Sequence, residues 1–137
     1  MDSTTQQTPW TQRPYGPNEM NHLSLPELRE RVTEIFAPFD PLRIILFGSH
    51  ARGQADEESD IDLIIVYDTT KKFLDRLEEL YEFWSLPKGV DILAYTPEEF
   101  DRMISENSFV QDAVRTGKIL YERSRQGSDS LVSAGRG

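Results

Sequence analysis

The chain has 137 residues, with 24 acidic and 15 basic side chains, a net charge of −9 and no cysteine. This length is enough for one domain with a single core. The lack of cysteine excludes disulfides, zinc–thiolate sites and cysteine nucleophiles. All of the net charge is carried by residues 25–124, because the two flanks together hold three acids and three bases, which cancel. So acidic a domain repels a polyphosphate backbone, and direct nucleic-acid binding is not expected.

The sequence also predicts how the chain is divided. Residues 1–22 are rich in Thr, Gln, Pro and Asn and are expected to form a disordered arm, with a partner-binding segment around Trp10 and Tyr15 as the alternative. Residues 23–124 are expected to fold, and residues 125–137, rich in Ser and Gly, to form a flexible tail. No apolar run reaches the roughly 18 residues that span a bilayer, and no secretion signal is visible, so we expect no membrane segment and a cytoplasmic location.

Hydrophobic spacing and capping signals predict alternating helices and strands. Ser24 and Glu27 have the spacing of a capping box and start a helix that runs to about Phe39. The strand Asp60–Tyr67 is apolar on both faces after Asp62, which is typical of a central strand covered on both sides. The other expected elements are strand Leu42–Phe47, a loop Ser49–Gly53 entering a short helix, helix Phe73–Trp84, strand Val90–Tyr95, a helix from the Thr96–Glu99 capping box through Met103, helix Ser108–Thr116 and edge strand Lys118–Tyr121.

The segment that joins the first two strands carries the candidate site. Asp60 and Asp62 project from one face of a strand, roughly 6–7 Å apart along it. Carboxylates this close repel each other unless a cation lies between them, and hard oxygen ligands favour Mg²⁺ or Mn²⁺. Gly48 lets the backbone approach a ligand closely, and a helix starting after Ser49 would offer free N–H groups to phosphate. Together these features indicate a nucleoside triphosphate site, although an Asp-x-Asp pair alone is common in proteins.

The joint pattern is more specific than its parts. An apolar strand, Gly48-Ser49, ten residues, Asp60-Ile-Asp62 and a second apolar strand follow one another. This pattern resembles the nucleotidyltransferase superfamily that includes the polymerase-beta palm. The string Gly-Ser-His-Ala-Arg-Gly-Gln-Ala, running into Ser-Asp-Ile-Asp-Leu, is similar to the minimal nucleotidyltransferases, and the resemblance covers about residues 25–122. It implies an α/β (α+β) palm-like fold, with a mixed, mostly antiparallel sheet and packed helices.

The resemblance implies in-line attack on the α-phosphate of ATP, with release of pyrophosphate. Gly48 and Ser49 would bind the β- and γ-phosphates, and Asp60 and Asp62 would hold two Mg²⁺ ions. A third carboxylate on a later strand completes the catalytic metal and helps to deprotonate the attacking hydroxyl. Asp91 is the only acid in such a position, and we assign it this role.

Three residues near the motif keep alternative interpretations. Asp91 is also placed to form a structural ion pair with Arg43 or Lys88. The guanidinium of Arg52 suits a triphosphate, but a solvated surface position explains it as well. His50 is expected to be a variable loop position without a catalytic role.

The resemblance further implies a biological role. Resemblance to the minimal nucleotidyltransferases implies the antitoxin of a two-gene toxin–antitoxin pair. In such pairs the nucleotidyltransferase adds AMP to a tyrosine of its partner, a helical HEPN ribonuclease toxin. One alternative is an antitoxin that masks its toxin by binding alone, against which the intact Asp60, Asp62 and Asp91 argue. The other is a transferase for a small molecule such as an aminoglycoside, which usually requires an added acceptor-binding domain. The sequence contains no signature for the nucleotide base.

Overall fold

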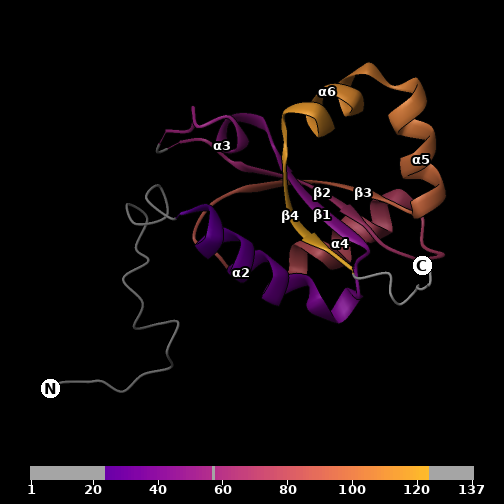
Figure 1. Cartoon of the computed structure of the whole chain (residues 1–137). Coiled ribbons are helices and arrows are strands. Elements are labelled where there is room, and N and C mark those ends of the chain that lie inside the picture. The colour runs from indigo at the N-terminus through magenta and orange to yellow at the C-terminus, as the bar shows by residue number, and fades with distance from the viewer. Residues whose placement is uncertain (1–23, 57, 124–137) are drawn as a thin grey trace, which may run out of the picture.

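The computed structural model describes residues 24–56 and 58–123, and the expected arm and tail lie outside these ranges. Figure 1 shows helices packed on both faces of one sheet. The helices are α2 (Leu25–Phe36), η2 (Ala37–Phe39, 3-10), α3 (Gly48–Ala51), α4 (Phe73–Phe83), α5 (Pro97–Glu106) and α6 (Ser108–Thr116). The strands are β1 (Arg43–Phe47), β2 (Ile61–Val66), β3 (Val90–Tyr95) and β4 (Lys118–Glu122).

The four strands form one mixed sheet in the order β3-β2-β1-β4. β1 pairs antiparallel with both β2 and β4, while β2 and β3 are parallel. The predicted fold class is therefore confirmed, β4 is an edge strand as expected, and β2 lies inside the sheet. Across the described ranges, no helix has both the length and the apolar character that crossing a bilayer requires.

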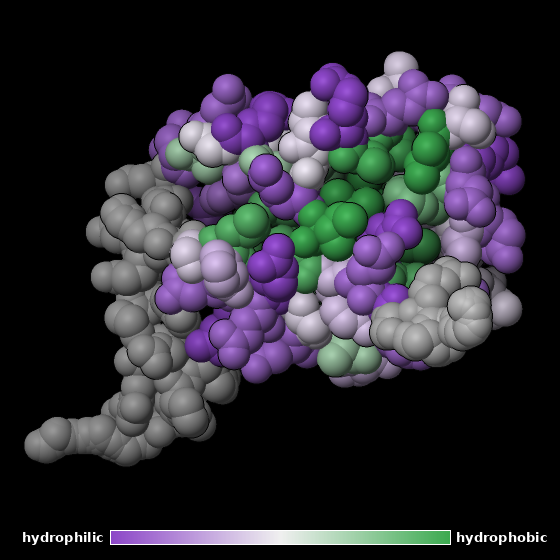
Figure 2. All heavy atoms as spheres, viewed as in Figure 1, coloured by the Kyte–Doolittle hydropathy of each residue, from purple (hydrophilic) through white to green (hydrophobic). Residues whose placement is uncertain are grey.

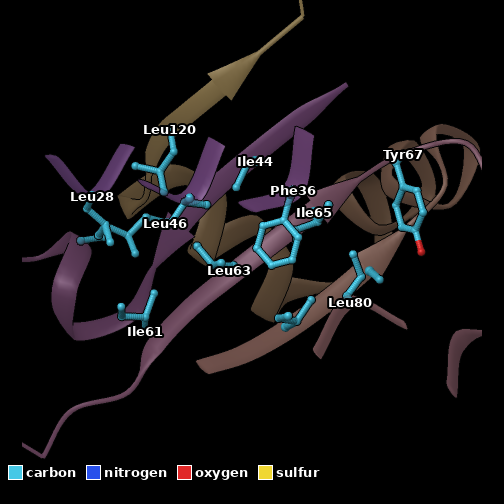
Figure 3. Close-up of a cluster of buried hydrophobic side chains, with 14 residues drawn as sticks. Leu28, Phe36, Ile44, Leu46, Ile61, Leu63, Ile65, Tyr67, Leu80 and Leu120 are labelled. Atoms are coloured by element: carbon cyan, nitrogen blue, oxygen red, sulfur yellow. The ribbon is translucent and has the colours of Figure 1, made fainter. Parts of the chain in front are cut away.

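The alternation of side chains along β2 divides the core between the two faces of the sheet. Leu63 and Ile65 pack with Phe36 of α2 and Leu80 of α4, as Figure 3 shows. The intervening residues of β2 face α5 and α6 on the other side. Because every β2 residue after Asp62 is buried, hydrophobic packing fixes the strand in place and leaves this aspartate as its one polar side chain.

Both predicted capping boxes form and fix where their helices begin. At α2 the backbone N–H of Ser24 donates to Glu27 at 2.9 Å, and the N–H of Glu27 donates to the Ser24 hydroxyl at 3.2 Å. At α5 the corresponding distances between Thr96 and Glu99 are 3.0 and 3.2 Å. The turn before Asp40 is 3-10 rather than α-helical, and Asp40 leaves it in the left-handed region with φ 52°.

Hydrophobic residues also reach the surface. Figure 2 shows them gathered in the middle of the face on which β4 and α6 lie, with hydrophilic residues around them. The large hydrophobic residues that these two elements expose are Phe109 and Ile119. Phe109 lies beside the candidate site described next.

Candidate active site

A row of three residues crosses one end of the sheet. In the strand register Phe47 of β1 lies opposite Asp62 of β2, and Asp62 lies opposite Asp91 of β3. Phe47 packs in the core layer beneath α5 and α6. Residues that face one another across neighbouring strands point to the same side of a sheet, so both carboxyl groups project on the α5–α6 side. The sheet therefore brings Asp62 and Asp91 together, although 28 residues separate them in the sequence.

Gly48 follows Phe47 directly and turns the chain over this row. Its φ is +75°, in the left-handed region that glycine adopts without strain. A Cβ atom at this position would lie only 2.2 Å from Oδ2 of Asp62. The glycine is therefore required both by the backbone and by the carboxylate beside it. Helix α3 begins at Gly48 itself and runs to Ala51, so the expectation of a loop over Ser49–Gly53 that enters a helix is wrong for its first residues.

The Asp62 carboxyl group lies in a strained electrostatic environment. Partial burial, the charge of Asp91, a hydrogen bond with the Asp91 carboxyl and the charge of Asp60 together raise the pKa of Asp62 to about 6. The attraction of Arg52 acts in the opposite direction but is the weakest of these effects. Two carboxyl groups held this close together form an all-oxygen donor pair that suits Mg²⁺ or Mn²⁺.

Asp60 is near this pair but is directed differently. It is exposed just before β2, and its Oδ1 lies 2.4 Å from the place where a Cβ on Gly89 would be. The Ile61 N–H donates to the Gly89 carbonyl at 3.0 Å and holds the two segments together. No three acidic, histidine or cysteine side chains of residues 24–56 and 58–123 are gathered as a metal-binding group. The donor set at Asp62 and Asp91 thus fits a divalent cation, while Asp60 would have to turn to join it.

The structure excludes one of the two structural partners considered for Asp91. Arg43 forms an ion pair with Glu122 at 2.8 Å. It lies at the far end of β1, opposite Val66. Asp91 itself is exposed at the start of β3, so its charge is not a buried charge that requires a structural partner.

Ser49, His50 and Arg52 lie on α3 and at its end. The Ser49 carbonyl accepts a hydrogen bond from Gln54 N–H at 2.9 Å. Nε2 of His50 lies 3.2 Å from the Ser59 carbonyl, so His50 ties the Gly-Ser segment to the residue that precedes Asp60. Arg52 is exposed and its Nε donates to Gln54 Oε1 at 3.3 Å, which leaves the guanidinium accessible to an anion.

A cavity of about 290 Å³ lies next to Asp62. Its walls are Phe47, Gly48, Arg52, Asp62, Phe109, Asp112, Ala113 and Thr116. Four of these residues belong to α6, a helix for which the sequence pattern predicted no role in the site. A signal was present: Val110 and Ala113 form the buried stripe of α6, and Phe109 is an aromatic residue outside that stripe.

The fold and the site agree with comparisons to known proteins. Residues 25–122 match the family model described as a nucleotidyltransferase domain. The chain belongs to the nucleotidyltransferase domain family, and the predicted family and enzyme class are confirmed.

Relatives and one solved structure are similar over most of the domain. A protein of Methanocaldococcus jannaschii, provisionally named a protein adenylyltransferase, is 32% identical over 88 residues, which cover 61% of this chain and 95% of that protein. MntA of Haemophilus influenzae, also provisionally named a protein adenylyltransferase, is 42% identical over 62 residues, 42% of this chain and 54% of that protein. A crystal structure described as a nucleotidyltransferase of Sulfolobus solfataricus has a TM-score of 0.53 at 24% identity, covers 85% of this chain and 93% of that one, and supports the fold.

Proposed function

We propose that this chain is a Mg²⁺-dependent nucleotidyltransferase that transfers AMP from ATP to a tyrosine of a cognate HEPN ribonuclease toxin and so acts as an antitoxin. The observation that carries the proposal is that Asp62 and Asp91 lie opposite each other on neighbouring strands, with Asp62 directly beside Gly48. A fold gains nothing from placing two carboxyl groups together at neutral pH. Their juxtaposition is explained by a cation that they hold during the reaction.

In this proposal the three aspartates have different roles as metal ligands and proton acceptor. Asp60 and Asp62 hold two Mg²⁺ ions, and Asp91 completes the ligands of one of them. When bound, Mg²⁺ supplies charge neutralisation for the triphosphate and makes a nearby hydroxyl more acidic. Asp91 accepts the proton of the attacking hydroxyl as its oxygen bonds to the α-phosphorus, while the bond to the β-phosphate breaks and pyrophosphate leaves.

The donor phosphates occupy the other side of Asp62 in this proposal. The backbone N–H groups at Gly48 and Ser49, with the Ser49 hydroxyl, bind the β- and γ-phosphates. The accessible guanidinium of Arg52 offsets their charge. Gly48 and Arg52 line the same cavity as Asp62, so in this proposal the donor and the carboxylates meet at one place.

The acceptor is proposed from chemistry and relatives together. A net charge of −9 disfavours a nucleic-acid acceptor. The relatives named protein adenylyltransferases support a protein hydroxyl as the acceptor. The motif from Gly48 to Asp62 is similar to that of the minimal nucleotidyltransferases, and this similarity supports a tyrosine of a HEPN toxin as the acceptor.

The test is to incubate the purified chain with ATP, Mg²⁺ and the HEPN protein encoded beside it. The mass of the toxin should rise by one AMP less water, on a tyrosine. The Asp60→Ala/Asp62→Ala double variant should still bind the toxin but leave its mass unchanged. It should also fail to protect cells that express the toxin.

One observation favours the masking antitoxin as a second candidate. The Asp60 carboxylate faces Gly89 instead of joining Asp62 and Asp91. A site left in this state would bind its toxin without chemistry. Full protection of cells by the double variant, together with no mass change from the wild type, would establish masking and refute transfer.

A further inference from the structure

The cavity beside Asp62 has two chemically different walls. Gly48 and Arg52 form one wall, which offers backbone N–H groups and a guanidinium to anions. Helix α6 forms the other wall through Phe109, Asp112 and Thr116. A ligand that fills the cavity must therefore be anionic at one end and suited to an aromatic ring and polar oxygens at the other.

Phe109 is both exposed and fixed in position. Its residue is 59% exposed, so the ring gains little from burial. It nevertheless meets the buried ring of Phe47 edge-on, with centroids 5.8 Å apart and an angle of 89° between the planes. Because Phe47 is the neighbour of Asp62 in the strand row, the Phe109 ring is held at a defined place beside the carboxylates and keeps most of its surface open.

The charge of the α6 wall fixes the direction of the ligand. Asp112 carries a carboxylate into this wall and forms an ion pair with Arg115. Its oxygens repel phosphate but accept hydrogen bonds from hydroxyl or amino groups. The phosphates therefore belong at Gly48 and Arg52, and an uncharged, hydroxyl- and amino-bearing group belongs at α6.

We propose that α6 binds the nucleoside of the donor, with Phe109 stacking on the nucleobase. The inference rests on the proposed function and adds a base-binding residue to it. Phe47 and Asp91 flank Asp62 on opposite sides. The wall that carries Phe109 is thus on the side of Asp62 away from Asp91. In the proposed function the acceptor hydroxyl is activated at Asp91, so a nucleobase at Phe109 leaves the path of the acceptor open. Aromatic stacking accepts any base, so Phe109 contributes affinity more than base selectivity.

The test compares two probes that share phosphates but differ in the nucleoside. A non-hydrolysable ATP analogue and inorganic tripolyphosphate are titrated with Mg²⁺ into the wild type and Phe109→Ala. The variant should bind the ATP analogue at least about tenfold more weakly, as expected for the loss of one base–aromatic stack. Its affinity for tripolyphosphate should stay unchanged, and Phe109→Tyr should retain the wild-type affinity for both probes.

Phe83→Ala is the matched control. Phe83 is 44% exposed and meets the ring of Phe39 edge-on, with ring centroids 4.8 Å apart, on the α2–α4 side of the molecule. This variant should leave both affinities unchanged. Equal weakening of both probes by Phe109→Ala, or no weakening at all, would overturn the role of Phe109 alone. If the wild type binds neither the ATP analogue nor tripolyphosphate, the proposed function is overturned and this inference with it.

Discussion

The two ends of the sheet treat a carboxyl group in opposite ways. At the end where β2 and β3 begin, burial and neighbouring acids raise the pKa of Asp62 to about 6. At the end where β3 finishes, a hydrogen bond from Arg76 lowers the pKa of Glu99 to about 2. The carboxyl group of Asp62 lies among like charges, whereas that of Glu99 is paired with a guanidinium. We propose that this difference separates a side chain placed for a ligand, Asp62, from one placed for the fold, Glu99.

The Glu99 end shows what a structural carboxylate requires. Arg76 is 6% exposed and binds Glu99 with two hydrogen bonds of 2.7 and 3.1 Å. It also donates to the carbonyls of Lys71 at 2.7 Å and Ala94 at 3.0 Å. Glu99 in addition caps α5 through the Thr96 N–H. Among residues 24–56 and 58–123, no comparable cation pairs with Asp62, since Arg52 lies exposed and bonds to Gln54.

The largest expected effect comes from Asp62→Asn, which keeps the shape but removes a charge and a proposed metal ligand. AMP transfer should fall by at least about 10³-fold, because both ions lose a shared ligand. The unfolding free energy at pH 7 should stay equal or rise slightly, since carboxylate repulsion is relieved. Turnover and urea unfolding measure the two quantities. Asp68→Asn, an exposed position just beyond the other end of β2, is the control and should alter neither. An Asp62→Asn protein that unfolds, or transfers AMP normally, contradicts the assignment.

Arg76→Ala should affect the opposite property. Removing the guanidinium leaves Glu99 and two carbonyls without their donor. Glu99 is 32% exposed in its side chain and regains some water, so we expect a loss of about 2–3 kcal/mol rather than the larger cost of a fully buried pair. Urea unfolding measures this loss. Arg102→Ala, an exposed arginine of the same region, should cost less than about 1 kcal/mol. Equal losses in the two variants would show that Arg76 has no special structural role.

Two glycines separate backbone strain from the site itself. Gly48 and Gly53 have nearly equal φ values of +75° and +73°. Only at Gly48 would an added Cβ lie within 4 Å of other atoms, and the nearest is Oδ2 of Asp62 at 2.2 Å. Alanine at either position should cost about 1–2 kcal/mol of stability. Only Gly48→Ala should also displace Asp62 and weaken nucleotide binding. If Gly53→Ala weakens binding equally, backbone strain rather than contact with Asp62 explains the effect.

The two carboxyl groups should also respond to pH in separate ranges. The folded pKa of Asp62 is raised from 3.8 to about 6, so the fold favours its protonated form and the wild type should gain stability as the pH falls from above 6 towards 4. The folded pKa of Glu99 is lowered from 4.5 to about 2, so its stabilisation is present above pH 4.5 and is lost as the pH falls towards 2. Unfolding of the wild type and Asp62→Asn at pH 7, 5 and 3 measures both. The variant should lack the gain near pH 5 but share the loss at pH 3; a gain in both proteins would assign it to another group.

The sequence predicted the parts of the site that local patterns carry. Gly48, Asp60 and Asp62 follow from strand periodicity and a turn, and the helix starts at Ser24 and Thr96 follow from capping boxes. The partnership of Arg76 with Glu99 was not predicted, because it depends on how α4 meets α5, 23 residues further along the chain.

Two further features of the site also depend on packing over a distance. The orientation of Asp60 towards Gly89 requires the parallel pairing of β2 with β3. The position of Phe109 requires α6 to pack against β1. Such contacts arise from tertiary packing, which the spacing of residues within one segment does not encode.

Mg²⁺-dependent nucleotide binding tests the central claim most directly, namely that the acidic end of the sheet is built to hold cations with a triphosphate. Calorimetric titration of a non-hydrolysable ATP analogue with and without Mg²⁺ should give tighter binding with the metal, because phosphate oxygens complete its coordination. Asp62→Asn should lose most of this difference. Equal affinity of the wild type with and without Mg²⁺ would contradict the account.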